Sequence, residues 1–539
     1  MKAELYKTRK VKLIYVLILC VLVAGLLLYY HPGKKYEIKQ YNSIDRPVKV
    51  QPDYAGCVIP PNIAPLNFVI QQEGADYFVR IYSQKGKPIE ISSKRPAILI
   101  PKRAWHELLD LNRGQQLSMD IYIQSGSGVS SKKENIRWSR FQSLTAQIAC
   151  QDIDTFLVYR KIRPAHGTWR NMGIYQRNLS GFDESTILNN GYFKNSCVNC
   201  HTFCGNRAEK MLIGIRSADY GSSALLVEGN KVHKIGTKLG YTSWHPSGRI
   251  AAFSVNKVRQ LFHSAASEVR DVVDFDSLMA YYLVESKNVK TTKDLTRKDR
   301  LETYPAWSAD GRYLYFCSAP VTWPDRTVVP EPHDQIKYDL VRAAYDIDND
   351  MWGPLETVLS ARDTDQSILL PRISPDGRWL LFCMCDYGCF PVYRHSSDLY
   401  MMDLEAAQQT GEYKYRRLDI NSEDSESWHC FSSNSRWIAF SSKRDSGVFT
   451  RIYIAYVDPN GKVHKPIRLP QKDPTYYDSC LWTYSVPELI TEPVRATKEK
   501  LGRVVRGSEK IPIEMPITMA TPKPGQPPGY QEPWQTERE

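Results

Sequence analysis

The sequence lacks the marks of several large functional classes. It has no continuous stripe of Lys and Arg interleaved with aromatic residues, and part of its net charge of +12 lies in the first twelve residues and after residue 492. Nucleic-acid binding is therefore not indicated. The G-x-S-x-G elbow of a serine hydrolase is also missing. No βαβ pattern surrounds its C-x-x-C motif, which argues against a thioredoxin-like redox pair.

One long uncharged run is present, residues 13–30, and it follows a segment rich in Lys and Arg. At about 1.5 Å per residue this run nearly spans a hydrocarbon core of roughly 30 Å, and its basic flank should stay in the cytoplasm. We expect a single-pass membrane anchor over residues 1–33, with the rest of the chain exported. A cleaved signal peptide is the alternative, although no small-x-small site follows the run.

The stretch S-C-V-N-C-H-T-F-C, from Ser196 to Cys204, contains a C-x-x-C-H motif. Two thiols at this spacing can bond to the vinyl groups of a haem, and the adjacent imidazole can bind the iron. We therefore predict one covalent haem c on Cys197 and Cys200, with His201 as the proximal ligand. Zinc bound by the three cysteines of this stretch, Cys204 included, is the alternative. Export favours haem, since c-type haem is attached outside the cytoplasm in bacteria.

The chain has twelve cysteines. Cys20 lies in the predicted anchor and two others are assigned to haem, so nine remain and at least one of them is unpaired. Cys57 and Cys150 flank a candidate domain and could be joined in a disulfide, but the sequence alone does not fix the pairing.

Composition divides the chain before and after the haem motif. Residues 34–56 are polar and read as a tether, and residues 57–150 contain short alternating runs separated by Gly and Pro turns, as in a small β-sandwich-like domain. Residues 151–209 form the haem-attachment segment. Residues 492–539 are charged and then rich in proline, which predicts a tail without a packed core.

A repeat organises residues 210–491. Each copy is a predicted hairpin with a turn of the Pro-Asp-Gly type and a strand that ends on Phe, and the copies occupy residues 244–253, 307–316, 373–382 and 431–440. Their turn positions, 248, 311, 377 and 435, lie 63, 66 and 58 residues apart. Hairpins at such periods indicate four-stranded propeller blades with long loops. We therefore predict a mainly β protein with a propeller of five or six blades.

The pattern S-P-D-G-R-W-L-L-F followed by D-L-Y-M-M-D-L resembles the TolB-type propeller repeat. With M-G-I-Y-Q-R-N-L and C-V-N-C-H, the chain is similar to a family of TolB-like envelope proteins of Gram-negative bacteria that carry one haem motif before the propeller. Members are often labelled as cytochrome c biosynthesis proteins. The resemblance implies haem, this architecture, and an inner-membrane protein that faces the periplasm.

The sixth ligand of the haem iron is the least determined part of the site. An electron carrier needs Met or His opposite His201, whereas a ligand-binding haem leaves that place open. We take Met211 or His245 as the distal candidates. Further candidates with a weaker basis are His166 and Met172, while His263 and His429 are expected in the core or on the surface.

Two functions from different classes follow. The first is a membrane-anchored, periplasm-facing monohaem protein that transfers electrons or senses a diatomic ligand, with the propeller binding a protein partner. The alternative is a non-redox interaction scaffold of the cell envelope. An oxidoreductase activity stays open, because a bound haem supplies redox chemistry without other catalytic residues.

Overall fold

The computed structural model describes residues 38–125, 138–163, 171–194, 196–263, 270–323, 325, 330 and 333–516. The expected membrane anchor, residues 1–33, lies outside these ranges, as does the end of the predicted tail. Within the described ranges, no helix has the length and apolar character needed to cross a membrane.

The N-terminal domain consists of two sheets and one helix. Seven strands form the larger sheet, along the path β1-β9-β8-β10-β3 with β5 and β6 attached through β8, and three strands form the smaller one. The larger sheet contains β1 (Tyr41–Pro47), β3 (Val58–Ile59), β5 (Asp76–Tyr82), β6 (Ile89–Ser93), β8 (Gln116–Gln124), β9 (Trp138–Gln142) and β10 (Leu144–Ile148). The smaller sheet contains β2 (Val50–Gln51), β4 (Phe68–Ile70) and β7 (Ala97–Ile98), and the helix is α2 (Lys102–Leu111).

This domain begins earlier than the sequence indicated. Strands β1 and β2 come from the segment expected to be a tether, and β1 pairs in parallel with β9 at the sheet edge. Cys57 is buried, Cys150 is exposed, and both thiols are free, so the disulfide considered from the sequence does not form.

The remaining strands form six antiparallel four-stranded sheets within the described residues. The first contains β34 (Thr483–Ile490), β11 (Phe156–Arg163), β12 (Asn171–Asn178) and β13 (Glu184–Asn189). The second contains β14 (Cys197–Cys204), β15 (Arg207–Arg216), β16 (Ser223–Glu228) and β17 (Lys231–Ile235). The third contains β18 (Thr242–Trp244), β19 (Ile250–Phe262), β20 (Arg270–Leu283) and β21 (Asn288–Lys290).

The other three sheets contain the last three copies of the sequence repeat. The fourth contains β22 (Arg300–Trp307), β23 (Tyr313–Pro320), β24 (Asp339–Asp346) and β25 (Met351–Leu359). The fifth contains β26 (Ser367–Ile373), β27 (Trp379–Cys385), β28 (Asp398–Asp403) and β29 (Tyr415–Arg417). The sixth contains β30 (Glu426–Phe431), β31 (Trp437–Ser442), β32 (Arg451–Tyr456) and β33 (Ile467–Arg468).

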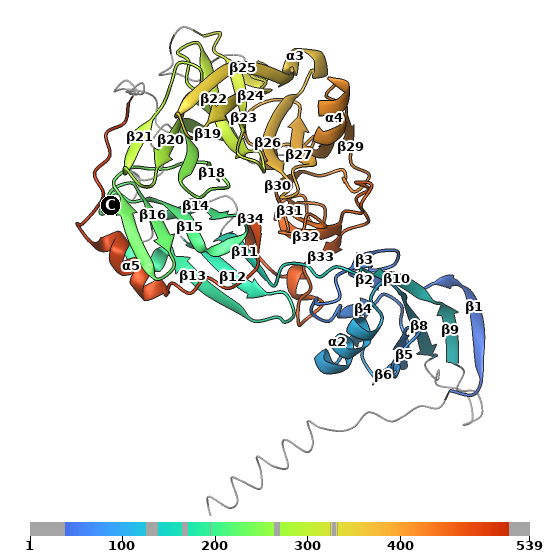
Figure 1. Cartoon of the computed structure of the whole chain (residues 1–539). Coiled ribbons are helices and arrows are strands. Elements are labelled where there is room, and N and C mark those ends of the chain that lie inside the picture. Colours follow the sequence, from blue (N-terminus) through green and yellow to red (C-terminus); the bar gives the residue numbers. More distant parts are fainter. Residues whose placement is uncertain are drawn as a thin grey trace, which may run out of the picture.

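The first strands of these sheets form a closed ring. Strand β14 contacts β18, and the contacts continue through β22, β26, β30 and β34 back to β14. The architecture is therefore a six-bladed β-propeller, whose blades form a ring in Figure 1. We call the region bounded by the six innermost strands, which contains the cavities described below, the channel. We number the blades 1 to 6 in the order of the sheets above.

The propeller takes in more of the chain than residues 210–491. Segment 151–209, expected to be a separate haem-attachment segment, supplies three strands of blade 1 and the innermost strand of blade 2. Blade 1 is completed by β34 from the other end of the propeller, which pairs with β11 from Phe156↔Ile490 to Ile162↔Thr483. This pairing closes the ring, because it joins the first and last strands of the propeller in one sheet.

The hairpins predicted from the repeat join the first and second strands of blades 3 to 6. Gly248, Gly311 and Gly377 adopt φ values of 68°, 76° and 80° at the turns. In the degenerate fourth copy Ser435 takes the same left-handed conformation, with φ 60°. Glycine suits these turns because it has no Cβ to clash at positive φ.

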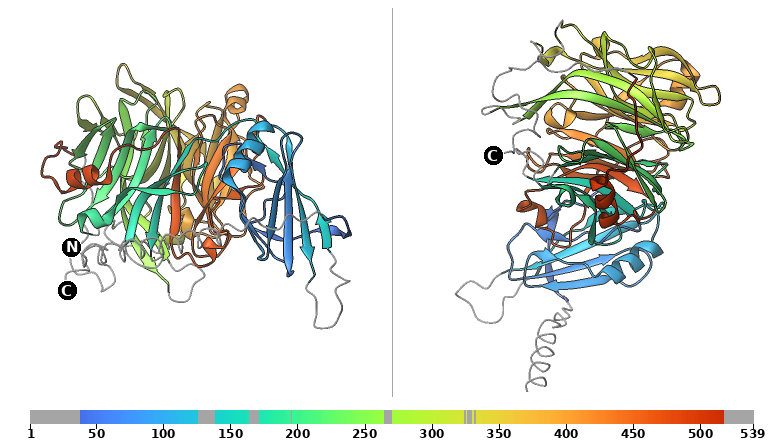
Figure 2. Two further views of the ribbon diagram at one scale, coloured as in Figure 1. Left: turned by 90° about the horizontal axis from the view of Figure 1, so that it is seen from below. Right: turned by 90° about the vertical axis from the view of Figure 1, so that its left-hand side faces the viewer.

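The N-terminal domain packs against blades 6 and 1, and Figure 2 shows it beside the ring. One hydrophobic core continues across the boundary and includes Tyr54 and Trp105 on one side and Trp437 and Leu489 on the other. The Asp154 carboxylate also accepts hydrogen bonds from the backbone N–H and hydroxyl of Ser433, at 2.8 and 2.5 Å.

The start of the predicted tail has a packed structure, contrary to expectation. Helix α5 (Lys498–Arg506) packs against blades 1 and 2, with Leu501 and Val505 buried. The Lys234 ammonium donates to the carbonyl oxygens of Val505 and Gly507, at 2.7 and 3.0 Å. There are two shorter helices. Helix α3 (Ala361–Thr364) connects blade 4 to blade 5, and α4 (Leu404–Thr410) connects β28 to β29 within blade 5.

Ring closure yields a stability prediction. Leu489 on β34 is fully buried, so Leu489→Ala should lower the free energy of unfolding by about 2–5 kcal/mol, through lost burial and a cavity. Leu481, just before β34, is half exposed, and Leu481→Ala should change the free energy of unfolding by less than about 0.5 kcal/mol. Denaturant unfolding of both variants measures the difference, and equal effects would contradict the role given to β34.

Candidate functional site in the propeller channel

The C-x-x-C-H motif lies on β14, the innermost strand of blade 2, where the chain borders the channel. A regular strand would point Cys197 and Cys200 to opposite faces, because side chains alternate. The register of β14 against β15 shifts between Asn199 and Thr202, and Cys200 has φ 57°. This bulge breaks the alternation at the second cysteine of the motif.

The same irregularity recurs around the channel. Tyr304, Leu370, Trp428 and Val486 also have positive φ, between 43° and 55°, each on the innermost strand of its own blade. With Cys200 they form a set of five left-handed residues, which we call the bulge ring. Such backbone conformations are costly for residues with a Cβ and are often found at functional sites. The bulge ring therefore identifies this part of the channel as the candidate site.

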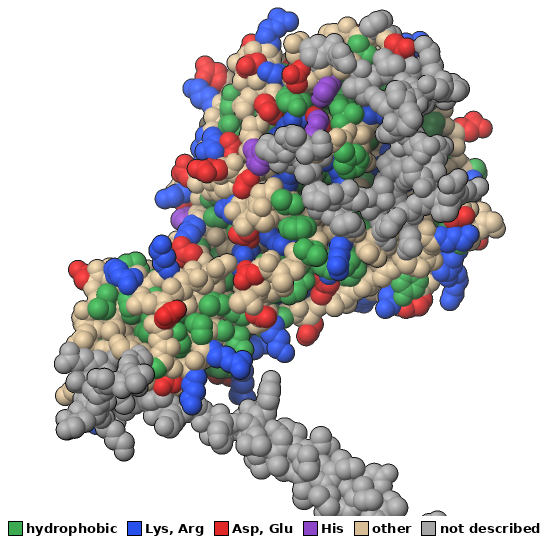
Figure 3. Space-filling model, turned by 180° about the vertical axis from the view of Figure 1, so that it is seen from behind, with side chains coloured by type: hydrophobic (Ala, Val, Ile, Leu, Met, Phe, Trp, Pro, Cys, Tyr) green, Lys and Arg blue, Asp and Glu red, His purple; other side chains and the backbone are tan. Residues whose placement is uncertain are grey.

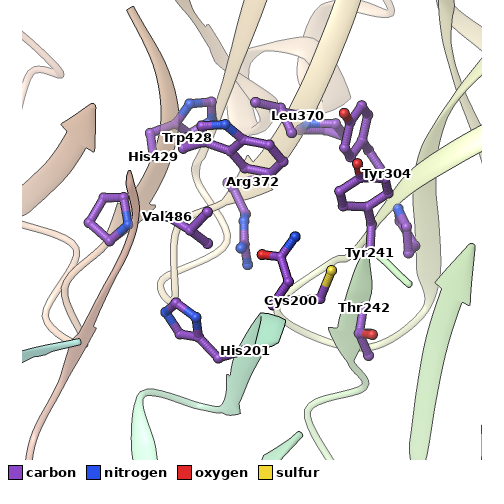
Figure 4. A pocket seen from close by; sticks show the side chains of 14 residues that line it. Cys200, His201, Tyr241, Thr242, Tyr304, Leu370, Arg372, Trp428, His429 and Val486 are labelled. Atoms are coloured by element: carbon purple, nitrogen blue, oxygen red, sulfur yellow. The ribbon is translucent and has the colours of Figure 1, made fainter. Parts of the chain in front are cut away.

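All six innermost strands or the residues next to them line one cavity, which we call the neck cavity. Every member of the bulge ring borders it. In Figure 4, His201 lies on one side of the neck cavity, and Trp428 and His429 lie on the other.

His201 is buried, with only 2% of its surface exposed. Within the part of the chain that the structure describes, neither of its ring nitrogens makes a hydrogen bond of normal geometry, and the Val486 backbone is the one polar group that acts weakly on the ring and raises its pKa slightly. Burial, together with the positive charges of Arg160 and Arg372, lowers the pKa of His201 to about 3. The imidazole is thus neutral at pH 7, and its lone pair is available to a metal. A buried polar group without a partner costs about 1–3 kcal/mol, which a bound ligand would offset.

The two thiols of the motif border adjoining cavities. Cys200 lines the neck cavity, and Cys197 lines a second cavity, which we call the chamber. Asn199, Tyr241 and Trp428 line both, so the two cavities share a wall. Both thiols are free, and burial raises the pKa of Cys197. Free neighbouring thiols beside a buried imidazole fit the donor set of a covalent haem.

One glycine makes room for this arrangement. A Cβ on Gly214, on the neighbouring strand β15, would lie 3.0 Å from the Asn199 carbonyl oxygen and 3.4 Å from the Cys200 Cβ. The bulge of β14 can therefore approach β15 closely, because Gly214 has only a hydrogen atom where other residues have a Cβ.

The structure places neither expected distal ligand at these cavities. Met211 is fully buried between the sheets of blades 1 and 2, packed with Phe203 and Ile213. His245 lies in the first turn of blade 3, where its Nδ1 is 2.8 Å from the Ser247 hydroxyl and its Nε2 is 3.2 Å from the Gly311 carbonyl oxygen.

Of the weaker candidates, Met172 lines the chamber together with Cys197. His429 lines the neck cavity, but its Nε2 is 3.1 Å from the Leu381 carbonyl oxygen and its Nδ1 is 3.7 Å from the Cys383 thiol. His166 lies outside the described residues, and His263 is exposed after β19.

The zinc alternative lacks a ligand set. The described residues contain no group of three His, Cys, Asp or Glu side chains placed to share a metal ion. The Cys204 thiol lies 3.9 Å from the His245 carbonyl oxygen, in a different hydrophobic cluster from Cys197. Haem requires fewer protein ligands, so this finding bears on zinc alone.

Several site residues were not identified from the sequence. Arg160, Arg216, Lys238 and Arg270 line the chamber, and Arg372 borders the neck cavity, where it forms a 2.6 Å ion pair with Glu488. The sequence offered one signal, Arg160, which is a charged residue directly after the uncharged run Thr155–Tyr159. The others come from four different strands or loops, which sequence spacing cannot bring together.

No protein-family model matches this chain, and the curated proteins include no match to its sequence. Among solved structures, TolB from Acinetobacter baumannii aligns over 70% of this chain and 79% of its own length, with 11% identity and a TM-score of 0.38. A hypothetical selenium-binding protein from Sulfolobus tokodaii aligns over 81% and 99%, with 8% identity and a TM-score of 0.35. These likenesses are weak, so the propeller assignment rests on the strand order and the closed ring.

The buried histidine yields a pH prediction for the haem-free protein. The folded pKa of about 3 lies below the usual unfolded value of about 6.5, so the unfolded chain binds the proton first as the pH falls. As the pH falls from roughly 6 to 4, His201 should therefore lower the free energy of unfolding by about 1.4 kcal/mol for each pH unit. Above pH 7 it should have no such effect.

His201→Gln removes this contribution and should flatten the decline in the free energy of unfolding, measured by urea titrations from pH 7.5 to pH 4.5. His263→Gln is the control, because that side chain is exposed. An unchanged pH dependence in His201→Gln would contradict a neutral, buried imidazole.

Proposed function

We propose that this chain is a propeller protein that carries one haem c in its channel, where Cys197 and Cys200 would hold the group through thioether bonds and His201 would bind its iron. The observation that carries the proposal is the buried His201 ring, whose two nitrogens make no hydrogen bond of normal geometry among the described residues, beside two free thiols at adjoining cavities. When bound, such a haem supplies reversible one-electron chemistry.

The protein residues around His201 would set the conditions for that chemistry. The channel buries the imidazole and keeps it neutral, so it can bind a metal without first losing a proton. Arg160 and Arg372 place positive charge near the ring, which favours the more electron-rich state of a bound redox group. Electron transfer fits this environment, and haem-based sensing of a diatomic ligand fits it if no sixth ligand is present.

The proposal also includes export of the chain to the periplasm. Covalent attachment requires export, for which the proposed means is the anchor over residues 1–33. The propeller would then face the periplasm of a Gram-negative bacterium and bind a protein partner there.

A second candidate function is a non-redox interaction scaffold of the cell envelope, and the fold itself supports it. The first-to-second strand turns of several blades surround a further cavity, lined by Ser308, Ser374 and Ser433 among others. On the described surface seen in Figure 3, basic and acidic side chains are interspersed. A mixed surface of this kind suits a protein partner better than a polyanion.

The first experiment separates these two functions. The full chain is exported in a strain with c-type maturation machinery and examined by a haem stain on a denaturing gel and by a pyridine haemochrome spectrum. We expect the unmutated protein to keep its haem after denaturation. The variant that carries both Cys197→Ala and Cys200→Ala should lose it. Cys204→Ala is the matched control and should keep its haem, because its thiol lies apart from the others. An unmutated protein without haem would leave the scaffold function.

The distal side gives a further prediction. Met172 and Met211 belong to the same buried cluster, but only Met172 also lines the chamber with Cys197, so we expect Met172 to supply the sixth ligand. Met172→Ala should change the reduced absorption spectrum and allow carbon monoxide to bind. Met211→Ala should lower stability by about 2–5 kcal/mol and leave the spectrum unchanged, since Met211 is a core residue. Carbon monoxide binding to the unmutated protein would instead indicate an open iron and a sensing role.

A further inference from the structure

The chamber has a pronounced charge bias. Four cationic side chains line it from separate parts of the fold, namely Arg160 on β11, Arg216 on β15, Lys238 before β18 and Arg270 on β20. The described residues that line the chamber include no Asp or Glu. A concave site with one sign of charge concentrates ligands of the opposite sign, so the chamber favours an anion.

The rest of the lining is largely apolar and aromatic. It includes Ile162, Val258, Val272, Phe390 and Trp428. Tyr241 also contributes, with its ring centroid 5.9 Å from that of Trp428 at an interplanar angle of 30°. Flat rings and aliphatic side chains match a ligand with a broad apolar body, whereas a small hydrated anion would leave them without a partner.

Arg160 and Lys238 are held in place by neutral partners. Arg160 donates from Nη1 to the Asn199 side-chain oxygen at 2.6 Å, and from Nε and Nη2 to the Ser485 hydroxyl at 3.1 and 2.8 Å. Arg270 donates to the Tyr393 hydroxyl at 3.1 Å, and Lys238 to the Asn256 carbonyl oxygen at 3.4 Å. These contacts orient the side chains without supplying a negative charge.

Bringing these cations together has a cost that an anion would offset. Burial, and after it the charge of Arg216, lowers the pKa of Lys238 to about 7. The free chamber thus holds Lys238 only partly charged at neutral pH. The other groups that act on it are the thiols of Cys197 and Cys200 and the buried carboxyl of Asp274, all of which favour the charged form.

We propose that the chamber recognises a flat, apolar dicarboxylate, and that this ligand is the tetrapyrrole of the attached haem, whose two propionates contact Arg160 and Lys238. The inference rests on the proposed function, since the tetrapyrrole would be bonded to Cys197 in the same chamber. Arg160 and Lys238 are then positioning residues, which would hold the ring in one orientation in the chamber.

The test measures carboxylate recognition without covalent attachment. The protein carrying both Cys197→Ala and Cys200→Ala serves as the parent and is titrated with haemin and with haemin dimethyl ester, which lacks the two negative charges. Binding is followed by the Soret absorbance. We expect haemin to bind at least about tenfold more tightly than the diester, a difference of about 1.4 kcal/mol.

Substitutions in the parent locate the interaction. Arg160→Gln and Lys238→Met should each weaken haemin binding by about five- to tenfold and leave the diester nearly unchanged, and Arg160→Lys should restore part of the loss. Arg312→Gln is the matched control, because Arg312 lies in an exposed turn of blade 4, does not line the chamber and pairs with Asp310. Urea unfolding of each variant shows that it is folded.

The pH dependence gives an independent readout. Lys238 is charged below its pKa of about 7, so the preference for haemin over the diester should fall as the pH rises from 6 to 8. Lys238→Met should remove this dependence, whereas Arg160→Gln should keep it.

The outcomes are separable from those of the haem stain. Equal affinity for haemin and its diester, or no binding of either, would overturn carboxylate recognition in the chamber even if covalent haem is present. Competition by glutarate at a concentration similar to that of haemin would identify a free dicarboxylate as the ligand and overturn the tetrapyrrole assignment. A haem stain that fails while haemin binds with the expected preference would refute attachment and leave the recognition of a tetrapyrrole standing.

Discussion

The structure depends on the pairing of β34 with β11. A propeller blade needs four strands to bury both of its faces against its neighbours, and the chain supplies only three for blade 1 before it enters blade 2. The fourth, β34, begins at Thr483, nearly 300 residues after β13 ends at Asn189, and pairs with β11 from Phe156↔Ile490 to Ile162↔Thr483. Because this pairing fixes the circumference of the ring, it also fixes the distances across the channel between innermost strands.

The candidate site follows from that geometry together with the strain in the innermost strands. Five residues from five blades adopt left-handed backbone conformations at the channel, and each accompanies or adjoins a shift in strand register. A bulge redirects side chains that would otherwise alternate, which is how Cys200 comes to border the neck cavity while Cys197 borders the chamber. Strained, bulky residues at one level of a channel are more readily explained by a ligand than by packing alone.

Charge in this region is arranged asymmetrically. The chamber is lined by cations, while the buried carboxylate of Glu488 lies on the other side of the neck and pairs with Arg372. Burial raises the pKa of Glu488, and Arg372 opposes this shift. The ion pair therefore offsets one positive charge near His201, whereas the Arg160 guanidinium stays oriented by neutral groups. Such an environment suits a ligand whose anionic end lies in the chamber.

The sequence by itself determined the repeat, the hairpin turns and the presence of a C-x-x-C-H motif, because each depends on residues close together in the chain. Asp-Gly turns and alternating strands are local, and so is the spacing of Cys197, Cys200 and His201. The sixth blade, the inclusion of residues 151–209 in the ring and the packing of α5 were decided by contacts between distant segments. The same holds for the site: Met211 and His245 were plausible ligands by distance along the chain, yet strand direction buries one in the core and places the other in a turn. Which charges face the channel was fixed only by ring closure, since Arg160, Arg216, Lys238 and Arg270 share no local pattern.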